Sequence, residues 1–184
     1  MNSITADFFM QKPAWIKQKQ KTNIFLIKLL NICNLLNIEF IVIPLVDNSS
    51  IKKGNKKKII NYFSLLKKNN YLKKTKILFE VDLPPKKVNS FIGYLDKSFG
   101  INYDTGNSAF FGYNFNDEKH YFKRVLNIHI KDRKKGGQTK TLGKGDVDFK
   151  LFIKYLLKIK YRNNLILQTY MPKNDNKVTY ETLK

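Results

Sequence analysis

The sequence has little of several residue types that define common protein classes. It contains one cysteine, Cys33, five prolines and one tryptophan among 184 residues. A single cysteine excludes an internal disulfide and is typical of proteins from a reducing compartment. Because Cys33 lies in an apolar helical run, we expect a buried core thiol rather than a nucleophile. We therefore expect a cytoplasmic protein.

The sequence also shows no pattern typical of a targeting segment or a membrane span. Residues 1–7 show no basic flank followed by an apolar core, so we expect no signal peptide. Residues 24–46 are apolar enough to be mistaken for a membrane span. Polar breaks at Lys28 and Glu39 and a proline at Pro44 interrupt them too often, and a helix followed by a buried strand explains them better. We expect no membrane partner.

Acidic residues are few. The 35 Lys and Arg against 14 Asp and Glu give a formal net charge of +21, which suggests nucleic-acid binding. However, arginine is scarce, and the lysines are spread over nearly every helical stretch instead of gathering on one. The densest run, residues 52–58, has the same character. We interpret the lysines as solvated helix faces in a protein encoded by an AT-rich genome. We expect no specific nucleic-acid partner.

The remaining composition is that of a globular domain. Hydrophobic residues make up 42% and aromatic residues 14% of the chain, which excludes an intrinsically disordered protein. A chain of this length supports one domain with a sizeable core. We predict a single domain over residues 1–184, with its core in residues 2–170 and a polar tail at 171–184.

Apolar strand-like runs alternate with segments of helical period. Strands are predicted at residues 2–6, 38–43, 76–82, 100–104, 125–129 and 164–169. Helices are predicted at residues 23–36, 57–68, 88–97, 117–124 and 149–159. This alternation predicts a parallel sheet wound as in a (β/α)8 TIM barrel. A complete barrel has eight strands and takes roughly 200 residues or more, so about six strands predict an incomplete one.

Polar side chains gather where the predicted strands end. They are Asp7, Asp47, Glu80, Asp104, His129 and Gln168. In a barrel the carboxyl ends of the strands meet on one face. Glu80, Asp104, His129 and Gln168 would bring together two carboxylates, an imidazole and an amide oxygen. Such a set suits a divalent cation such as Mn²⁺, Mg²⁺ or Co²⁺, and Zn²⁺ is a further candidate.

Each of these residues also has an ordinary explanation. Asp104 could cap a helix, Glu80 could pair with a lysine, and His129 could be a core histidine with its hydrogen bonds satisfied. Their shared position at strand ends favours a metal site over three separate structural roles. His120, by contrast, lies in a helix of lysine and tyrosine, where we expect a solvated side chain.

The segment from Val125 to Arg133 runs from a strand into a polar end and then into a glycine-containing loop, residues 136–145. Lys131 and Arg133 could hold a phosphate or a carboxylate, as could the amide groups of the loop. A plain flexible lid is an equally good reading of the loop.

Seven motifs together resemble a known family. They occupy residues 5–10 (TADFFM), 42–50 (VIPLVDNSS), 78–85 (LFEVDLPP), 100–109 (GINYDTGNSA), 127–133 (NIHIKDR), 142–149 (LGKGDVDF) and 167–169 (LQT). In combination they resemble the sugar-phosphate isomerase/epimerase family, whose fold is the xylose isomerase-like TIM barrel. The resemblance runs from about Ile4 to Thr169, and only the combination of motifs is specific.

The resemblance implies a function in carbohydrate metabolism and roles for particular residues. Glu80, Asp104 and His129 match metal-ligand positions, and Glu80 would remove the proton α to a carbonyl to give an enediolate. Lys131 is a second catalytic candidate. The residues that we expect to contact substrate are Asp7, Asp47, Asn107 and Arg133.

One position departs from the family pattern. Many members have a second glutamate on the last strand, as metal ligand and acid/base, where this chain has Gln168. An amide oxygen can bind a cation, but an amide cannot take a proton. Epimerisation by two glutamates therefore loses one partner, which Lys131 or Asp132 would have to replace. A one-base aldose–ketose isomerisation remains open.

Two other functions remain open. A non-catalytic remnant or binding module of the same fold agrees with Gln168. An endonuclease IV-like nuclease shares the barrel and suits the charge, but its zinc cluster needs many histidines and this chain has two.

The family barrel has two further βα units before the strand at Ile4, so we expect this chain to be a fragment with an open sheet edge at each end. The apolar residues Ile4, Phe8, Leu165 and Leu167 would then be incompletely buried, and the chain should tend to self-associate. A fragment of this kind could lack the isomerase or epimerase activity that the resemblance implies.

Overall fold

The computed structural model describes residues 2–16 and 20–168. They form two compact units. The first contains residues 2–16, 20–102 and 121–126, and the second contains residues 103–120 and 127–168. The predicted polar tail and Thr169 lie outside the described residues, and the prediction of one domain over residues 1–184 stays a prediction.

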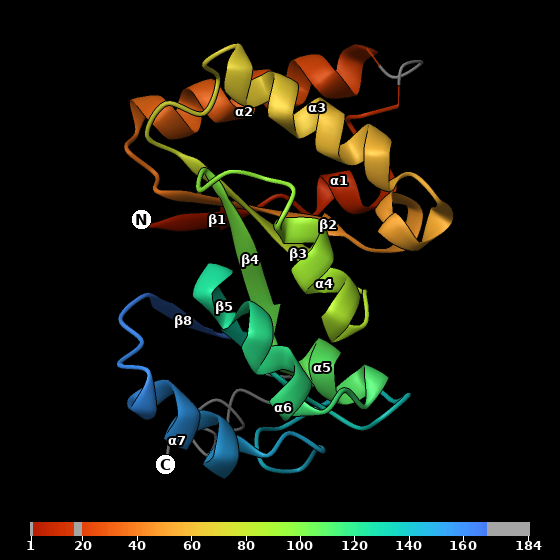
Figure 1. Cartoon of the computed structure of the whole chain (residues 1–184), viewed down its shortest axis with the longest axis vertical. Coiled ribbons are helices and arrows are strands. Elements are labelled where there is room, and N and C mark those ends of the chain that lie inside the picture. The colour runs from red at the N-terminus through yellow and green to blue at the C-terminus, as the bar shows by residue number, and fades with distance from the viewer. Residues whose placement is uncertain (1, 17–19, 169–184) are drawn as a thin grey trace, which may run out of the picture. The chain divides into compact units, whose positions relative to one another are not determined.

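The described strands build a six-stranded sheet in the order β1-β2-β3-β4-β5-β8 (Figure 1). Their bounds are β1 Ser3–Thr5, β2 Phe40–Leu45, β3 Lys76–Val81, β4 Phe99–Asp104, β5 Val125–Ile130 and β8 Asn164–Leu167. The pairs β1–β2, β2–β3, β3–β4 and β5–β8 are parallel. The six predicted strands and their parallel arrangement are thereby confirmed, against eight strands in a complete TIM barrel.

Of the helices described in the first unit, all but the first overlap a predicted helix. They are α1 Phe8–Gln11, α2 Gln20–Leu35, α3 Lys56–Lys68 and α4 Pro85–Ile92, with short 3-10 turns at Asp47–Ser49 and Ile51–Lys53. On α2 the buried positions Leu26, Leu30 and Cys33 recur at helical spacing, which confirms the buried thiol. The prediction for α4 was wrong at both ends. Its start was missed because Pro85 occupies the first helical turn, where its missing N–H costs nothing. No described helix could span a membrane.

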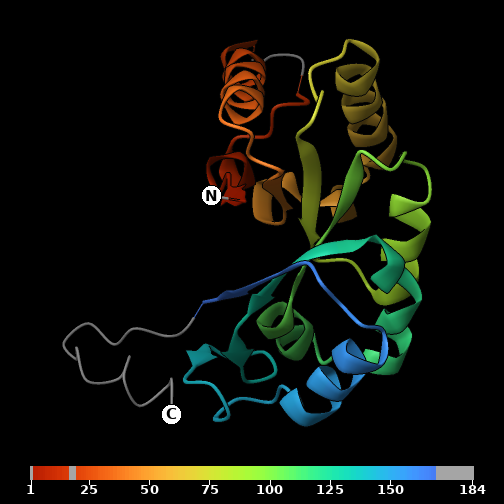
Figure 2. The same ribbon diagram turned by 90° about the vertical axis from the view of Figure 1, so that its left-hand side faces the viewer.

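The second unit differs more from the prediction. Its elements are α5 Thr105–Phe111, α6 Phe115–Glu118, β6 Asp132–Arg133, β7 Thr139–Lys140 and α7 Phe149–Lys158, besides β5 from residue 127 and β8 (Figure 2). Helix α5 was not predicted. The helix predicted at 117–124 is the single turn α6 followed by a 3-10 segment, Lys119–Arg124. Strand β7 in the glycine-containing loop pairs antiparallel with β6 just before the loop, and this pair was not predicted either.

Stacked phenylalanines form the core of the first unit. Phe63 of α3 lies edge-on to Phe79 of β3 with ring centroids 4.8 Å apart, and Phe79 stacks on Phe99 of β4 at 5.9 Å. Trp15 also contacts Phe63, with ring centroids 5.8 Å apart. All six residues of β2 are buried as well. These contacts fix β3 and β4 next to one another.

Strand β4 is held in place by a glycine and an arginine. A Cβ atom at Gly100 would lie 2.8 Å from Leu78 Cδ2 and 2.9 Å from the carbonyl oxygen of Arg124, so a larger residue would force the neighbours apart. The Arg124 guanidinium donates hydrogen bonds to the carbonyl oxygens of Leu95, Asp96 and Phe99. The start of β4 is therefore fixed against its neighbours in the first unit.

Within the described residues, β1 pairs only with β2, and β8 pairs only with β5. Phe8 is 45% exposed, Leu165 51% and Leu167 44%, and Ile4 is half-buried. The expectation of two open sheet edges with incompletely buried apolar residues is confirmed for the part of the chain that the structure describes.

Candidate metal centre

Asp104 ends β4 and begins α5 at the same time. Its Oδ1 accepts a hydrogen bond from the backbone N–H of Asn107 at 2.8 Å, which caps the helix. Its Oδ2 lies 3.1 Å from Lys131 Nζ in an ion pair. The Asp104 side chain is 1% exposed and that of Lys131 is 24% exposed. Both oxygens of this buried carboxylate therefore have a partner within the second unit.

His129 lies on β5 and is 1% exposed. The residue after the Asp104 cap, Thr105, ties the start of α5 to the end of β5. Its Oγ1 accepts a hydrogen bond from the Lys131 N–H at 2.8 Å and donates to the Lys131 carbonyl oxygen at 2.5 Å. This link fixes the end of β5, with His129 and Lys131, against the end of β4, with Asp104.

Glu80 lies on β3, and Asn102 on the neighbouring strand fixes its carboxylate. Asn102 Nδ2 donates to Glu80 Oε2 at 2.9 Å, and Asn102 is 2% exposed. Because residues two apart on a strand face the same way, Asn102 and Asp104 share one face of β4. Sequence reasoning missed Asn102, although its two-residue spacing from Asp104 is a usable signal.

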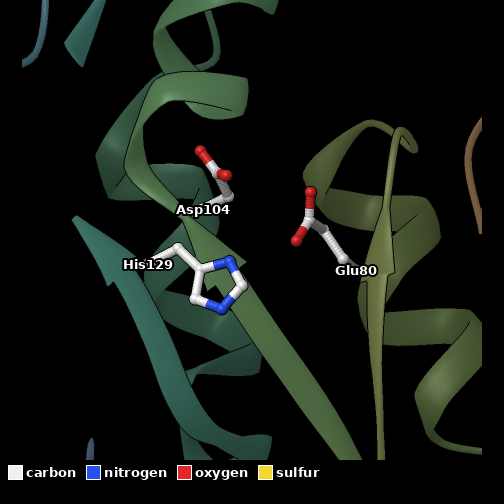
Figure 3. A group of neighbouring side chains, drawn as sticks. All are labelled: Glu80, Asp104 and His129. Atoms are coloured by element: carbon white, nitrogen blue, oxygen red, sulfur yellow. The ribbon is translucent and has the colours of Figure 1, made fainter. Parts of the chain in front are cut away.

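Three side chains point toward one another from successive strands of the sheet (Figure 3). One ligand atom each of Glu80, Asp104 and His129 lies within 4.8 Å of the other two. Two carboxylates and an imidazole are a donor set that divalent Mn, Co, Fe or Zn accepts. Among the described residues, the donor chemistry of these three fits a divalent cation.

The family comparison agrees with this arrangement. The family model described as xylose isomerase-like TIM barrel matches residues 9–184. The chain belongs to this family. A search among curated proteins found no significant match.

Solved structures share this fold. A xylose isomerase domain protein from Planctomyces limnophilus superposes with a TM-score of 0.76 at 17% identity, over 100% of this chain and 75% of that one. The IOLI protein, solved with a zinc atom, gives 0.69 at 15% identity over 100% and 71%. A D-allulose 3-epimerase from Methylomonas sp. in complex with D-allulose gives 0.62 at 16% identity over 86% and 59%.

Gln168 follows β8 directly. Its backbone N–H donates to the carbonyl oxygen of Ile130 at 2.9 Å, which extends the pairing of β8 with β5 by one residue. The side chain is half-buried. Its role as a fourth metal ligand stays a prediction.

Asp7 and Asp47 both belong to the first unit and are exposed. Asp47 Oδ2 accepts a hydrogen bond from Gln11 Nε2 at 3.0 Å, and Asn48 Nδ2 donates to Gln11 Oε1. Neither aspartate belongs to the group of three metal-ligand candidates. Their expected contacts with substrate stay predictions.

Arg133 and Asn107 are bonded to each other. Arg133 Nη1 donates to Asn107 Oδ1 at 3.3 Å, while Nε and Nη2 donate to the carbonyl oxygen of Gly137. The guanidinium carbon lies 4.1 Å from the ring centroid of Phe110, a cation–π contact. Arg133 thus holds the β6–β7 pair against α5, and substrate binding by either residue stays a prediction.

Asp132 organises the glycine-containing loop. It is 1% exposed, and its two oxygens accept the backbone N–H groups of Gly145 at 2.8 Å and Val147 at 3.2 Å. A Cβ at Gly145 would overlap Asp132 Oδ1, so glycine is required there. Because the carboxylate is engaged in this way, Lys131 is the stronger candidate for a second catalytic group.

The opposite face of β4 carries a buried polar cluster. Tyr103 Oη and Ser108 Oγ both donate to Glu118 Oε2, at 2.8 and 2.7 Å. Burial, with the nearby Glu118 carboxylate, raises the pKa of Tyr103 well above its usual range, so the phenol remains a donor. The cluster anchors α5 and α6 to the strand that carries Asp104. His120 is exposed, as predicted.

Proposed function

We propose that this xylose isomerase-like chain is a metal-dependent isomerase or epimerase that acts on a sugar or sugar phosphate through an enediolate. The observation that carries the proposal is the approach of Glu80, Asp104 and His129 to within 4.8 Å. Structures of similar fold include a 3-epimerase bound to D-allulose, which supports a small sugar as the ligand.

Asp104, His129 and Glu80 are the residues that would hold the cation, with Gln168 as a further oxygen ligand. Neutralisation of the negative charge that develops on the substrate oxygens is the chemistry that a divalent cation supplies in such a site. Beside these four protein ligands, a six-coordinate cation such as Mg²⁺ or Mn²⁺ would have positions left for substrate oxygens. Mn²⁺, Mg²⁺, Co²⁺ and Zn²⁺ remain the candidates.

Glu80 acts as the base. Its carboxylate, held by Asn102, takes the proton from the carbon next to the substrate carbonyl and becomes a carboxylic acid. Return of this proton to the neighbouring carbon, together with transfer of the hydroxyl proton from one substrate oxygen to the other, completes an aldose–ketose isomerisation with one carbon base. Gln168 cannot take a proton, and this path needs no second base at the substrate carbons.

Lys131 is the second group at the site. Its side chain is three-quarters buried, and its ammonium lies 3.1 Å from Asp104 Oδ2. In an epimerisation it would deliver a proton to the opposite face of the substrate carbon. A cation bound by Asp104 would also be repelled by this ammonium, so Lys131 limits metal affinity.

We expect solvent exchange of the substrate proton to require a divalent metal. After removal of metals with a chelator, the protein is reloaded with Mn²⁺, Mg²⁺, Co²⁺ or Zn²⁺ and incubated in D₂O with aldoses, ketoses and their phosphates. NMR should detect deuterium next to the carbonyl only with metal present. Lys131→Met should bind metal about tenfold more tightly, a gain of about 1.4 kcal/mol. Exchange in this variant should slow for an epimerisation and should persist for a one-base isomerisation, which does not use Lys131.

Lys134→Met is the matched control, because Lys134 pairs with the exposed Asp146 on the loop. It should alter neither metal affinity nor exchange. Metal binding without exchange on any sugar would identify a non-catalytic binding module. Full exchange after chelation, or no metal binding at all, would contradict the proposal.

We also infer that the chain self-associates through its open edges. β1 and β8 each leave backbone groups on one side without a strand partner among the described residues, and Leu165 and Leu167 are about half exposed. Sedimentation velocity should show oligomers that become smaller in a Leu165→Lys, Leu167→Lys variant. Leu157→Lys on α7, at a site that is 74% exposed and belongs to neither edge strand, should leave the oligomers unchanged. A wild-type monomer would refute the inference.

A further inference from the structure

A pocket of about 170 Å³ lies within the second unit, between α5, α6 and the start of α7. It is far larger than one water molecule needs, and it is smaller than the sites of drug-sized ligands, which measure about 300–1,000 Å³. Its occupant would therefore be a small molecule. Besides aliphatic and hydroxyl residues, four aromatic side chains and two carboxylates line it: Tyr103, Tyr113, Phe115, Phe152, Asp146 and Asp148.

Two of the four aromatic rings remain open to solvent. Tyr103 is 5% and Phe152 is 3% exposed, and these two rings stack on each other with centroids 5.7 Å apart. Tyr113 and Phe115 are only half-buried, so parts of their rings stay accessible to a ligand. The face of an aromatic ring is electrically negative and attracts a cation within about 6 Å of its centroid.

The Phe115 ring already holds a cation of this chain. The Lys119 ammonium lies 5.3 Å from the ring centroid of Phe115 and 5.2 Å from that of Tyr155. Lys119 is not among the residues that line the pocket. The aromatic cluster around the pocket therefore forms cation–π contacts within the protein itself, and its accessible rings can form them with a ligand.

One carboxylate of the lining has no ion-pair partner among the described residues. Asp148 is exposed and caps α7, where its Oδ1 accepts the backbone N–H of Leu151 at 2.9 Å. Asp146, the other carboxylate, is paired with Lys134 at 2.6 Å. Within the part of the chain that the structure describes, no lysine, arginine or histidine lines the pocket. The pocket is therefore locally negative, although the chain has a formal net charge of +21.

The hydroxyl groups of the lining are engaged as donors. Tyr103 and Ser108 both donate to Glu118 Oε2, at 2.8 and 2.7 Å, and Thr105 donates to the carbonyl oxygen of Lys131 at 2.5 Å. An anionic ligand needs N–H or O–H donors, which these three groups have already committed. A methylated ammonium needs only ring faces, apolar contacts and a nearby negative charge.

We propose that this pocket binds a small organic cation with a methylated ammonium group. The accessible rings of Tyr113 and Phe115 contact the methyl groups and the charge, and Asp148 balances the charge. A neutral molecule of the same shape lacks both electrostatic interactions, and Asp148 repels an anion. The proposal is independent of the metal-ligand candidates and of the sugar chemistry.

Choline is the probe, and 3,3-dimethyl-1-butanol, which has carbon in place of the choline nitrogen, is its neutral isostere. Both are titrated at physiological ionic strength, where long-range attraction to the protein surface is screened, and binding is followed by saturation-transfer NMR. Choline should bind saturably with a dissociation constant of about 1 mM, and the isostere at least about tenfold more weakly. Absence of saturable choline binding, or equal binding of the isostere, would overturn the proposal.

Asp148→Asn removes the charge but keeps the cap of α7, because asparagine caps helices as well as aspartate. It should weaken choline about fivefold and leave the isostere unchanged. Tyr113→Leu removes one accessible ring and should also weaken choline about fivefold. Asp117→Asn is the matched control, because Asp117 is an exposed acidic residue on α6 that does not line the pocket.

Asp117→Asn should bind choline like the wild type. An equal loss in this control would show that Asp148 acts only through the overall charge of the protein, which contradicts a site at the pocket. If Asp148→Asn and Tyr113→Leu, both with wild-type circular dichroism, bind choline normally, the pocket is not the site.

Discussion

Glu80→Gln is expected to lower the turnover of the sugar substrate by about 10²- to 10⁴-fold, the usual contribution of a general base. The amide cannot accept the proton from the carbon next to the carbonyl. Its oxygen can still accept the hydrogen bond that Asn102 donates to Glu80 Oε2. Steady-state kinetics should therefore show the loss in kcat, while the melting temperature stays close to that of the wild type.

Glu39→Gln is the matched control, since Glu39 is an exposed carboxylate just before β2. It removes the same charge from the chain without touching the site, and its kinetics should equal those of the wild type. Deuterium exchange separates base chemistry from binding, because Glu80→Gln should abolish exchange even at saturating substrate. Unchanged kcat in Glu80→Gln would show that the proton is removed by another group.

Buried strands were the most predictable part of the fold. β2 and β3 are short apolar runs between helices of clear period, and the structure places them within two residues of the prediction. Helix α5 was missed because Thr105, Gly106 and Asn107 read as a turn. What makes them helical is the Asp104 cap and the hydrogen bonds from Thr105 to the end of β5. Such tertiary support cannot be read from local propensity.

The three metal-ligand candidates were predictable for a related reason. A parallel sheet brings strand ends together, so Glu80, Asp104 and His129 could be grouped before any coordinates. Partners that depend on loop conformation could not be foreseen. Nothing in the sequence indicates that Arg133 reaches the carbonyl of Gly137, or that Asp132 accepts N–H groups from residues 145 and 147.

Under the proposed function, Asp104 would combine two roles that the sequence presented as alternatives. It caps α5 through Oδ1, and it is one of the three candidate ligands. One carboxylate can do both because each oxygen accepts more than one partner. The cap also fixes the carboxylate in space, which favours cation binding because no side-chain freedom is lost.

Asp104→Asn should weaken metal binding by about 100-fold or more, since loss of even outer-shell partners weakens metal sites 10- to 100-fold. Asparagine is as good a helix cap as aspartate, so the Asn107 N–H keeps its acceptor. Asp104→Ala should lose the metal equally and also the cap. Calorimetric titration with Mn²⁺ or Zn²⁺ measures the first effect, and urea unfolding without metal measures the second.

Both variants remove the ion pair with Lys131, so the difference between them isolates the cap. Asp104→Ala should be less stable than Asp104→Asn by about 1 kcal/mol, within the 0.5–2 kcal/mol range of N-cap deletions. Asp117→Asn, at an exposed acidic residue in the first turn of α6, is the control and should keep the metal affinity of the wild type. Metal affinity retained in Asp104→Asn would remove Asp104 from the ligand set and leave it as the helix cap alone.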